Sequence, residues 1–179
     1  MDSLAGKLLI SSPSLVDPNF RRTVVLVTHH DEEGAVGIVL SRPSEMRIDD
    51  AVPDLGALPY ADEVVYIGGP VQPEAVVVLA ELDEPLEETE PIVGSVVYMP
   101  PGIDVDALPA SRVRVFAGYS GWGPGQLERE LEESAWIVAA ALPQDVFASD
   151  PDDLWRTVLH RKGGKFTLIA TMPFDPGLN

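Results

Sequence analysis

The sequence contains no cysteine and few cations, and both shortages limit what the protein can be. Without cysteine, the chain cannot form disulfides, thiolate nucleophiles, iron–sulfur clusters or cysteine-ligated zinc sites. Only 12 Lys and Arg stand against 29 Asp and Glu, which gives a formal net charge of −17. Such a charge repels nucleic acid and anionic membrane surfaces, so direct nucleic-acid binding is not expected. An organism whose proteins are generally acidic would produce the same charge without any functional meaning.

The chain also lacks a long hydrophobic run. No stretch reaches the roughly 18 apolar residues that a membrane-spanning helix needs, and the opening MDSLAGKLLISSPSL lacks the basic segment and long apolar core of a secretion signal. We therefore expect a cytoplasmic protein without membrane contact. Its 179 residues suit one domain that buries roughly 70% of its unfolded surface. No linker or repeat divides the chain, so we expect a single domain over residues 1–179.

Apolar strands account for most of the N-terminal region. Residues 7–11 form a short predicted strand, and residues 20–30 form a longer one with consecutive aliphatic side chains at its centre. Consecutive apolar residues indicate a strand that is covered on both faces. An acidic turn at 31–34 then leads into a returning strand at 35–41. Together these segments predict a hairpin over residues 20–41.

The predicted hairpin determines which side chains meet. If it closes at the acidic turn, His30 lies opposite Ala35 and Thr23 lies opposite Arg42. Arg22 and His30 are eight residues apart on one strand, which corresponds to about 26 Å. The two ends of the hairpin therefore cannot serve one small active site.

Three arginines gather at the end of the hairpin that is remote from the turn: Arg21, Arg22 and Arg42. Their guanidinium groups would either pair with nearby carboxylates, such as those of Asp17 or Asp49, or form a pocket for a small anion or nucleotide-like ligand. Both hypotheses remain open from the sequence.

The pair His29 and His30 stands beside three acidic residues, a composition that resembles a metal site. Adjacent strand residues point to opposite faces, so the two imidazoles cannot readily chelate one ion. We expect no metal at this turn, and the sequence indicates no cofactor elsewhere.

The stretch 113–141 joins a strand, a glycine-rich segment and a helix. VRVFA at 113–117 alternates arginine and apolar side chains as a half-buried strand does. The glycines of 118–125 predict a tight turn, with Trp122 packed into the core. Apolar spacing predicts a helix over 126–141, with its buried stripe at Leu127, Leu131, Ala135 and Val138.

Three known motifs come close to this turn, and each fails on spacing. A nucleophile elbow needs G-x-S-x-G, whereas the chain reads G-Y-S-G-W. A dinucleotide loop needs G-x-G-x-x-G, whereas the chain reads G-W-G-P-G. A phosphate loop needs Lys followed by Ser or Thr, where this chain has Gln-Leu. A structural turn is therefore the favoured interpretation.

Two functional hypotheses for this turn stay open beside the structural one. Ser120 could act as the nucleophile of a hydrolase or transferase, with His30 or His160 as its base. Alternatively, the turn could hold an anionic ligand, with Ser120, Trp122 and Gln126 as candidate binding residues.

Gly68 and Gly69 end a strand predicted over residues 64–67. A glycine pair allows close backbone approach, either to another strand or to a ligand, so both residues are candidate ligand-binding positions. The remaining predictions are a helix at 47–52, strands at 75–80 and 91–99, a helix that starts near Ser149 and ends at Gly163 and Gly164, and a strand at 166–172.

Several segments together resemble the YqgE/AlgH family. They are GKLLISSPSLVDPNFRRTVVLVTHH, GAVGIVLSRP, IGGP, FAGYSGWGPGQLERELEESAW and LWRTVLHRKGG, and their order holds over nearly the whole chain. The resemblance places family motif positions at Pro13, Asp17, Pro18, Phe20, Arg21, Arg22, His30, Gly34, Gly37, Pro43, Gly68, Gly69, Pro70, Gly118, Tyr119, Trp122, Gly125, Gln126, Leu127, Glu128 and Trp136. Ser41 departs from the asparagine of the family pattern.

The resemblance implies a single bacterial α+β domain whose mixed, branched and partly barrel-like sheet is flanked by helices. It implies no established reaction. One branch of the family is labelled a transcriptional regulator, but the sequence shows no helix-turn-helix with a basic face, so regulation would act through a partner protein or small ligand. The leading hypothesis is a non-enzymatic cytoplasmic binding or regulatory module that takes a small anionic or nucleotide-like ligand.

Overall fold

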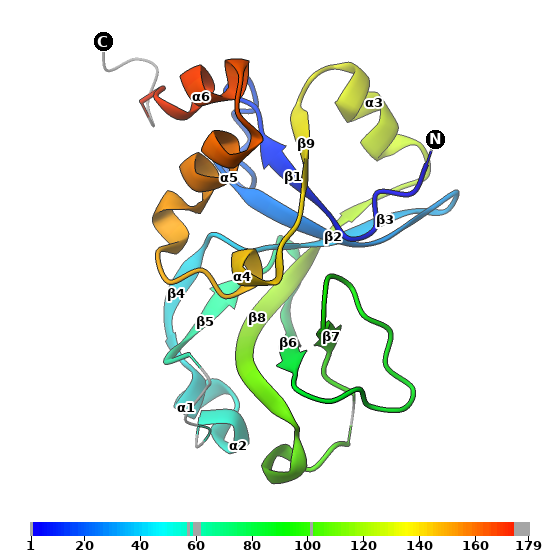
Figure 1. The fold of residues 1–179 in the computed structure, drawn as a ribbon, viewed down its shortest axis with the longest axis vertical. Coiled ribbons are helices and arrows are strands. Elements are labelled where there is room, and N and C mark those ends of the chain that lie inside the picture. Colours follow the sequence, from blue (N-terminus) through cyan, green and yellow to red (C-terminus); the bar gives the residue numbers. More distant parts are fainter. Residues whose placement is uncertain (1, 57, 59–61, 101, 174–179) are drawn as a thin grey trace.

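Nine strands and six helices make up the described part of the chain, which covers residues 2–56, 58, 62–100 and 102–173 of the computed structural model (Figure 1). The strands are β1 (Lys7–Ser11), β2 (Val24–Asp31), β3 (Gly34–Val39), β4 (Pro43–Arg47), β5 (Val64–Ile67), β6 (Val71–Leu82), β7 (Val96–Tyr98), β8 (Ala110–Trp122) and β9 (Trp136–Ala140). The helices are α1 (Ile48–Ala51), α2 (Pro53–Gly56), α3 (Gln126–Glu132), α4 (Pro143–Val146), α5 (Leu154–Lys162) and α6 (Lys165–Ala170), with 3₁₀ turns at Val105–Ala107 and Pro151–Asp153. The predicted α+β class with a mixed sheet is confirmed.

The sheet is branched and does not close. Its main path runs β4-β5-β8-β3-β2-β1-β9, and β6 and β7 branch from it at β8. The last residues of β8 pair with β3, whereas its earlier residues pair with β6 and, in parallel, with β5. We call β1, β2, β3 and β9 the upper half and β4 to β7 the lower half, as they lie in Figure 1. The long strand β8 joins the two halves.

The hairpin of β2 and β3 confirms the predicted pairing of His30 with Ala35 at its turn end. A β-bulge in the middle of the hairpin then shifts the register by one residue, because β2 contains one unpaired residue more than β3. The shift brings Ser41 to the start of β2, where its hydroxyl oxygen accepts a hydrogen bond from the first amide of that strand. The predicted pairing of Thr23 with Arg42 is therefore wrong by one residue.

Both faces of β1 and β2 are buried, as the consecutive aliphatic residues predicted. Leu8 on one face packs in the core with Trp155 of α5, and Leu9 on the other face packs with Leu127 of α3. Every residue from Val24 to Val27 is 0% exposed. Each such aliphatic side chain contributes roughly 1.5–3 kcal/mol through burial. The upper half is therefore a central layer between helices.

The helix predicted over 126–141 is wrong in its second half. α3 ends at Glu132, and the chain returns as β9, which pairs with β1 along its whole length. The helix stops because Ser134 takes a positive φ of 59°, which an α-helix does not allow. The apolar spacing of this stretch also suits a buried strand, and β1 offers an edge that needs pairing.

The glycine turn predicted over 118–125 is shorter than expected, because β8 continues through Gly118 and Gly121 to Trp122. A side chain on Gly118 would meet the Gly69 carbonyl oxygen at 2.5 Å, and its φ is 72°. Glycine at this position therefore serves a close contact between two backbones.

The strand predicted at 166–172 is wrong, since this segment forms α6. Phe166, Ile169 and Ala170 pack against the main core and are spaced as one face of a helix. The predicted end of the preceding helix is confirmed, because α5 stops at Lys162 and Gly163 follows as its cap.

Local sequence patterns were sufficient for one further element and insufficient for three others. The strand predicted at 64–67 is confirmed as β5. The predicted helix at 47–52 is the shorter α1, and the predicted strand at 91–99 is reduced to β7. β4 has the polar sequence PSEMR and is mostly exposed, so no apolar alternation marked it as a strand.

Candidate functional site

Arg42 fastens the turn that precedes β2. Its Nη1 donates to the Asn19 carbonyl at 2.7 Å, and its Nη2 donates to the Arg21 carbonyl at 3.1 Å. Burial lowers the pKa of Arg42, while the Asp17 carboxylate acts in the opposite direction. The hairpin thus brings Arg42 against the backbone of Arg21, and hydrogen bonds to the turn engage its two terminal nitrogens.

Arg22 is held over the surface of α5. Its φ of 53° lies in the left-handed region that non-glycine residues rarely adopt, at a cost of the order of 1–3 kcal/mol. The guanidinium carbon lies 4.3 Å from the centroid of the Trp155 ring, which is cation–π geometry. Its Nη1 also donates to the Met172 carbonyl at 3.0 Å. These contacts fix the guanidinium group in place despite the strained backbone.

Arg156 of α5 brings a third cation to Arg21 and Arg22. Burial lowers the pKa of Arg22, and repulsion from Arg156 and then from Arg21 lowers it further, whereas Asp153 acts in the opposite direction. Arg22 therefore lies close enough to Arg156 and to Arg21 for each of them to repel its charge. We call this group the arginine patch (Arg21, Arg22 and Arg156).

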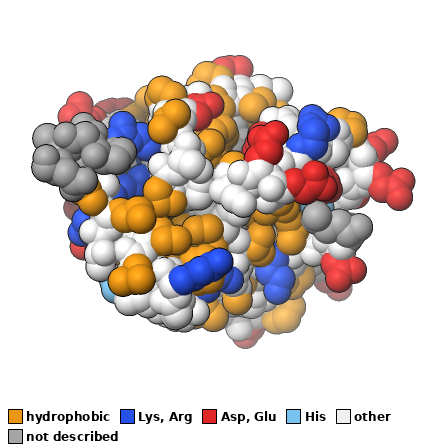
Figure 2. Space-filling model, turned by 90° about the horizontal axis from the view of Figure 1, so that it is seen from above, with side chains coloured by type: hydrophobic (Ala, Val, Ile, Leu, Met, Phe, Trp, Pro, Cys, Tyr) orange, Lys and Arg blue, Asp and Glu red, His pale blue; other side chains and the backbone are white. Residues whose placement is uncertain are grey.

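The arginine patch adjoins a segment without acidic residues. From Leu154 to Met172 the sequence contains no Asp or Glu, although the whole chain carries a net charge of −17. In the view from above, Lys and Arg side chains lie beside hydrophobic ones on the side of α5 and α6, and more of the visible acidic side chains lie on the opposite side (Figure 2). Sequence reasoning missed Arg156, and this acid-free segment is the signal that could have found it.

A small pocket lies at the predicted arginine cluster, between the turn and the lower half of the sheet. It has a volume of about 50 Å³ and is lined by Asn19, Val39, Arg42, Ile67, Gly69 and Pro70. A water molecule takes about 30 Å³ in the liquid. The pocket thus brings the predicted residues Arg42 and Gly69 together, but it has no room for a nucleotide.

Gly68 and Gly69 lie directly against β8. A side chain on Gly69 would come within 2.2 Å of the Tyr119 carbonyl, and one on Gly68 within 2.3 Å of the Gly118 carbonyl oxygen. The Gly68 carbonyl also accepts a hydrogen bond from the Val39 amide at 2.8 Å. Close approach to another strand, one of the two predicted alternatives, accounts for both glycines.

The predicted residues Trp122 and Gln126 meet at Glu130, which sequence reasoning did not single out. One carboxylate oxygen of Glu130 accepts hydrogen bonds from the indole nitrogens of Trp122 at 2.9 Å and Trp136 at 2.7 Å. The other oxygen accepts from the Gln126 amide at 2.9 Å. Phe20 packs on both indole rings, at centroid distances of 6.1 and 5.6 Å. This network holds α3 against the sheet.

Ser120 and His30 do not form a nucleophile and base. Ser120 is 0% exposed, and its hydroxyl donates to the Gly68 carbonyl at 3.2 Å. His30 accepts a hydrogen bond from a backbone amide at Nδ1, so its Nε2 carries the proton and donates to Glu128 at 2.8 Å. The backbone amide of Glu128 and then His30 lower the pKa of this carboxyl. His160, the other predicted base, is exposed on α5.

The model of the AlgH-like family (DUF179) matches residues 8–167, which run from the first strand into the last helix. The chain belongs to the AlgH-like family. It is 42% identical over 187 residues to the UPF0301 protein SCO2948 of Streptomyces coelicolor, with 100% of this chain and 97% of the relative covered. It is also 36% identical over 180 residues to the UPF0301 protein CT0663 of Chlorobaculum tepidum, with 97% and 95% covered.

Two solved structures share the fold. The crystal structure of DIP2367 from Corynebacterium diphtheriae matches with a TM-score of 0.87 and 29% identity, covering 96% of this chain and 94% of that one. The solution structure of AlgH from Pseudomonas aeruginosa matches with a TM-score of 0.73 and 30% identity, covering 97% of both chains. The resemblance identified from the sequence motifs is therefore confirmed.

The described residues of this AlgH-like chain contain no group of three or more histidines and acids that could hold a metal ion. In the same part of the chain, no helix is long and apolar enough to cross a bilayer.

Proposed function

We propose that this AlgH-like chain acts as a single cytoplasmic binding domain, without catalysis, and that it takes an anionic group at the arginine patch. The observation that carries the proposal is the convergence of Arg21, Arg22 and Arg156 on one region of an otherwise strongly acidic protein. Hydrogen bonds from guanidinium groups to anions are roughly twice as strong as neutral ones. An anion would also offset the repulsion that Arg22 experiences from Arg156 and Arg21.

The held position of Arg22 supports a binding role. A guanidinium group that is already stacked on Trp155 loses little rotamer freedom when a ligand arrives, so less of the binding energy is lost to ordering. The buried hydroxyl of Ser120 and the fully engaged ring of His30 give no comparable support to a hydrolase or transferase.

A small phosphate-bearing molecule is the first candidate ligand, and an acidic partner protein is the second. The exposed apolar side chains of Leu168 and Met172, which are 72% and 43% accessible, favour the second candidate because they lie in the same acid-free segment. A regulatory role would then operate through that partner. Both candidates use the same guanidinium groups, so both depend on Arg156.

The three tryptophans provide a test with an internal control. We expect inorganic phosphate or ADP, added at constant ionic strength, to shift the indole N–H NMR signal of Trp155 with saturation. The signals of Trp122 and Trp136 should stay in place, because their indoles donate to Glu130 on the other face of the sheet.

Two variants separate the patch from general charge effects. Arg156→Gln should weaken the phosphate-dependent shift of Trp155 at least fivefold, since it removes one guanidinium without touching the stacked Arg22. Arg129→Gln on α3 removes the same charge from an exposed site and should leave the affinity unchanged. Equal affinities of the two variants, or a Trp155 signal that does not respond, would contradict the proposal.

A further inference from the structure

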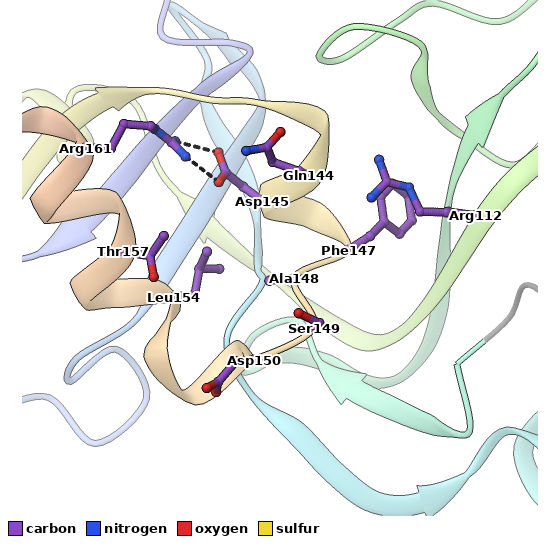
Figure 3. A pocket seen from close by; sticks show the side chains of 10 residues that line it. All are labelled: Arg112, Gln144, Asp145, Phe147, Ala148, Ser149, Asp150, Leu154, Thr157 and Arg161. Atoms are coloured by element: carbon purple, nitrogen blue, oxygen red, sulfur yellow. Dashed lines mark hydrogen bonds and ion pairs between the residues drawn. The ribbon is translucent and has the colours of Figure 1, made fainter.

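A second cavity lies on the other side of α5, between this helix, α4 and the first part of β8 (Figure 3). Its volume is about 360 Å³, which falls at the lower end of the range for sites that bind small molecules. Arg112 of β8 stands at one side of the cavity, and Arg161 with Asp145 stands at the other (Figure 3). None of the residues predicted from the sequence lines it.

On the side formed by Arg161 and Asp145, the two charged groups form hydrogen bonds with each other. Asp145 is 2% exposed and accepts two hydrogen bonds from the Arg161 guanidinium, at 2.8 and 2.7 Å. It also accepts a hydrogen bond from the Leu142 amide at 2.8 Å. The hydrogen bond with Asp145 raises the pKa of Arg161. The charges of the two groups cancel, and the pair acts as a wall of the cavity.

Arg112 differs from Arg161, because in the described part of the chain only its Nε is bound to a carboxylate, while its terminal nitrogens face the cavity. Its Nε donates to a Glu81 carboxylate oxygen, and its guanidinium carbon lies 4.7 Å from the centroid of the Phe147 ring. These two contacts orient the guanidinium plane. Among the described residues, none accepts a hydrogen bond from the terminal nitrogens of Arg112, and 39% of its side chain is exposed. The two terminal nitrogens form a fork that fits a carboxylate.

The remaining lining combines carbon surface with polar groups, which are Gln144, Ser149, Thr157 and the carboxylate of Asp150. Leu154, which is 3% exposed, and Ala148 supply carbon surface beside Phe147. Behind Ala148, the guanidinium of Arg114 donates to its carbonyl at 3.1 Å, and the buried Nη1 of Arg114 has no partner among the described residues. Asp62 offsets the charge of this guanidinium, because its carboxylate accepts two hydrogen bonds from Arg114, at 2.6 and 3.1 Å. Because Glu81 already offsets one charge, a dianion is less favoured than a monoanion.

We propose that this cavity binds a small monocarboxylate with an aromatic or branched apolar body. The carboxylate lies on the terminal nitrogens of Arg112, and the body lies against Leu154, Ala148 and Phe147. This site is separate from the arginine patch, and it selects by shape as well as by charge.

Benzoate is a suitable probe, and amide NMR signals report where it binds. We expect benzoate to shift the backbone amides of Ser149 and Thr157, which line the cavity, with saturation. Acetate lacks the apolar body and benzamide lacks the charge, so each should bind at least tenfold more weakly at the same ionic strength. The Trp155 indole signal, which reports the arginine patch, should not respond to benzoate.

Matched variants make the test decisive. Arg112→Gln should weaken benzoate binding at least tenfold, whereas Arg129→Gln, at an exposed position on α3, should leave it unchanged. Because Arg112→Gln also removes the contact with Phe147, Thr157→Tyr provides a second variant that fills the cavity from an exposed helix position while keeping Arg112. It should abolish the shifts at Ser149 and leave the thermal transition in place. Unchanged benzoate affinity in both variants, or equal affinity for acetate and benzoate, would overturn the proposal.

Discussion

At the scale of single residues, Glu130 holds together parts of the chain that the sequence separates. Its carboxylate accepts two indole N–H groups and one amide, from β8, β9 and α3 itself. Trp122 and Trp136 are only 6% and 5% exposed, so their N–H groups have little access to water. A buried donor without a partner costs about 1–3 kcal/mol.

Replacement of Glu130 should therefore destabilise the protein strongly. We expect Glu130→Ala to lower the free energy of unfolding by about 2–4 kcal/mol, since two indole donors lose their acceptor. Urea unfolding followed by tryptophan fluorescence measures the change. Glu132→Ala is the control, because Glu132 is exposed on the same helix and the helix propensity changes equally. A difference between the variants below about 0.5 kcal/mol would show that water replaces the carboxylate.

The candidate residues of the arginine patch were predictable only in part. Arg21 and Arg22 are adjacent, and strand pairing was enough to bring Arg42 to the same end of the hairpin. Arg156 could not be placed in this way, because its position depends on how α5 packs across β1 and β2. Spacing within one element determines local neighbours, but helix packing on a sheet is a property of the whole core.

At the scale of elements, strands and helices were predicted best where a local signal decides them. β1, β5 and the end of α5 follow from short apolar runs and from glycine after a helix. β9 and α6 were assigned the wrong type because their apolar spacing suits both a helix and a buried strand. β9 became a strand because β1, which is distant in sequence, offered it an edge. α6 became a helix that packs on its neighbour in the chain, α5.

The contact between the segment at Gly69 and β8 gives a second prediction. Gly69→Ala would place a methyl group 2.2 Å from the Tyr119 carbonyl, which forces two backbones apart. We expect a loss of at least about 3 kcal/mol in the free energy of unfolding, or failure to fold, since overpacking of this severity disrupts strand pairing.

Gly163→Ala separates the steric effect from the backbone effect. Gly163 also has a positive φ, 76°, but nothing lies within 4 Å of the added methyl group. Its replacement should cost only about 1 kcal/mol, because the left-handed backbone is then the sole source of strain. Thermal unfolding followed by circular dichroism measures both variants. Similar losses at the two positions would mean that the chain relaxes at Gly69 without strain.

At the scale of the whole molecule, charge is distributed unevenly. The 29 acidic residues repel one another, while α5 and α6 carry cations without acids among them. Repulsion over the body opposes the compact state, and salt screens it. The arginine patch lies beside the segment 154–172, which contains no acidic residue.

Stability should therefore rise with ionic strength. Raising sodium chloride from about 10 to 150 mM shortens the screening length from about 30 to about 8 Å. At pH 7 we expect the midpoint of thermal unfolding to increase by about 2–4 °C, which corresponds to about 1 kcal/mol for a chain of this size. Differential scanning calorimetry measures the shift. Near the isoelectric point, about 4.3, the salt-dependent increase in the midpoint should vanish. A fall in the midpoint at pH 7 would show that repulsion among the acidic side chains does not limit the stability.

The position of β1 within the upper half bears on how the protein is made. β1 lies between β2, which follows it closely in sequence, and β9, which is translated only after most of the chain has left the ribosome. During synthesis the hairpin can form early, but the outer edge of β1 has no strand to pair with until residues 136–140 emerge. A nascent chain therefore carries an open, apolar strand edge until β9 has been translated, and an edge of this kind is prone to aggregation.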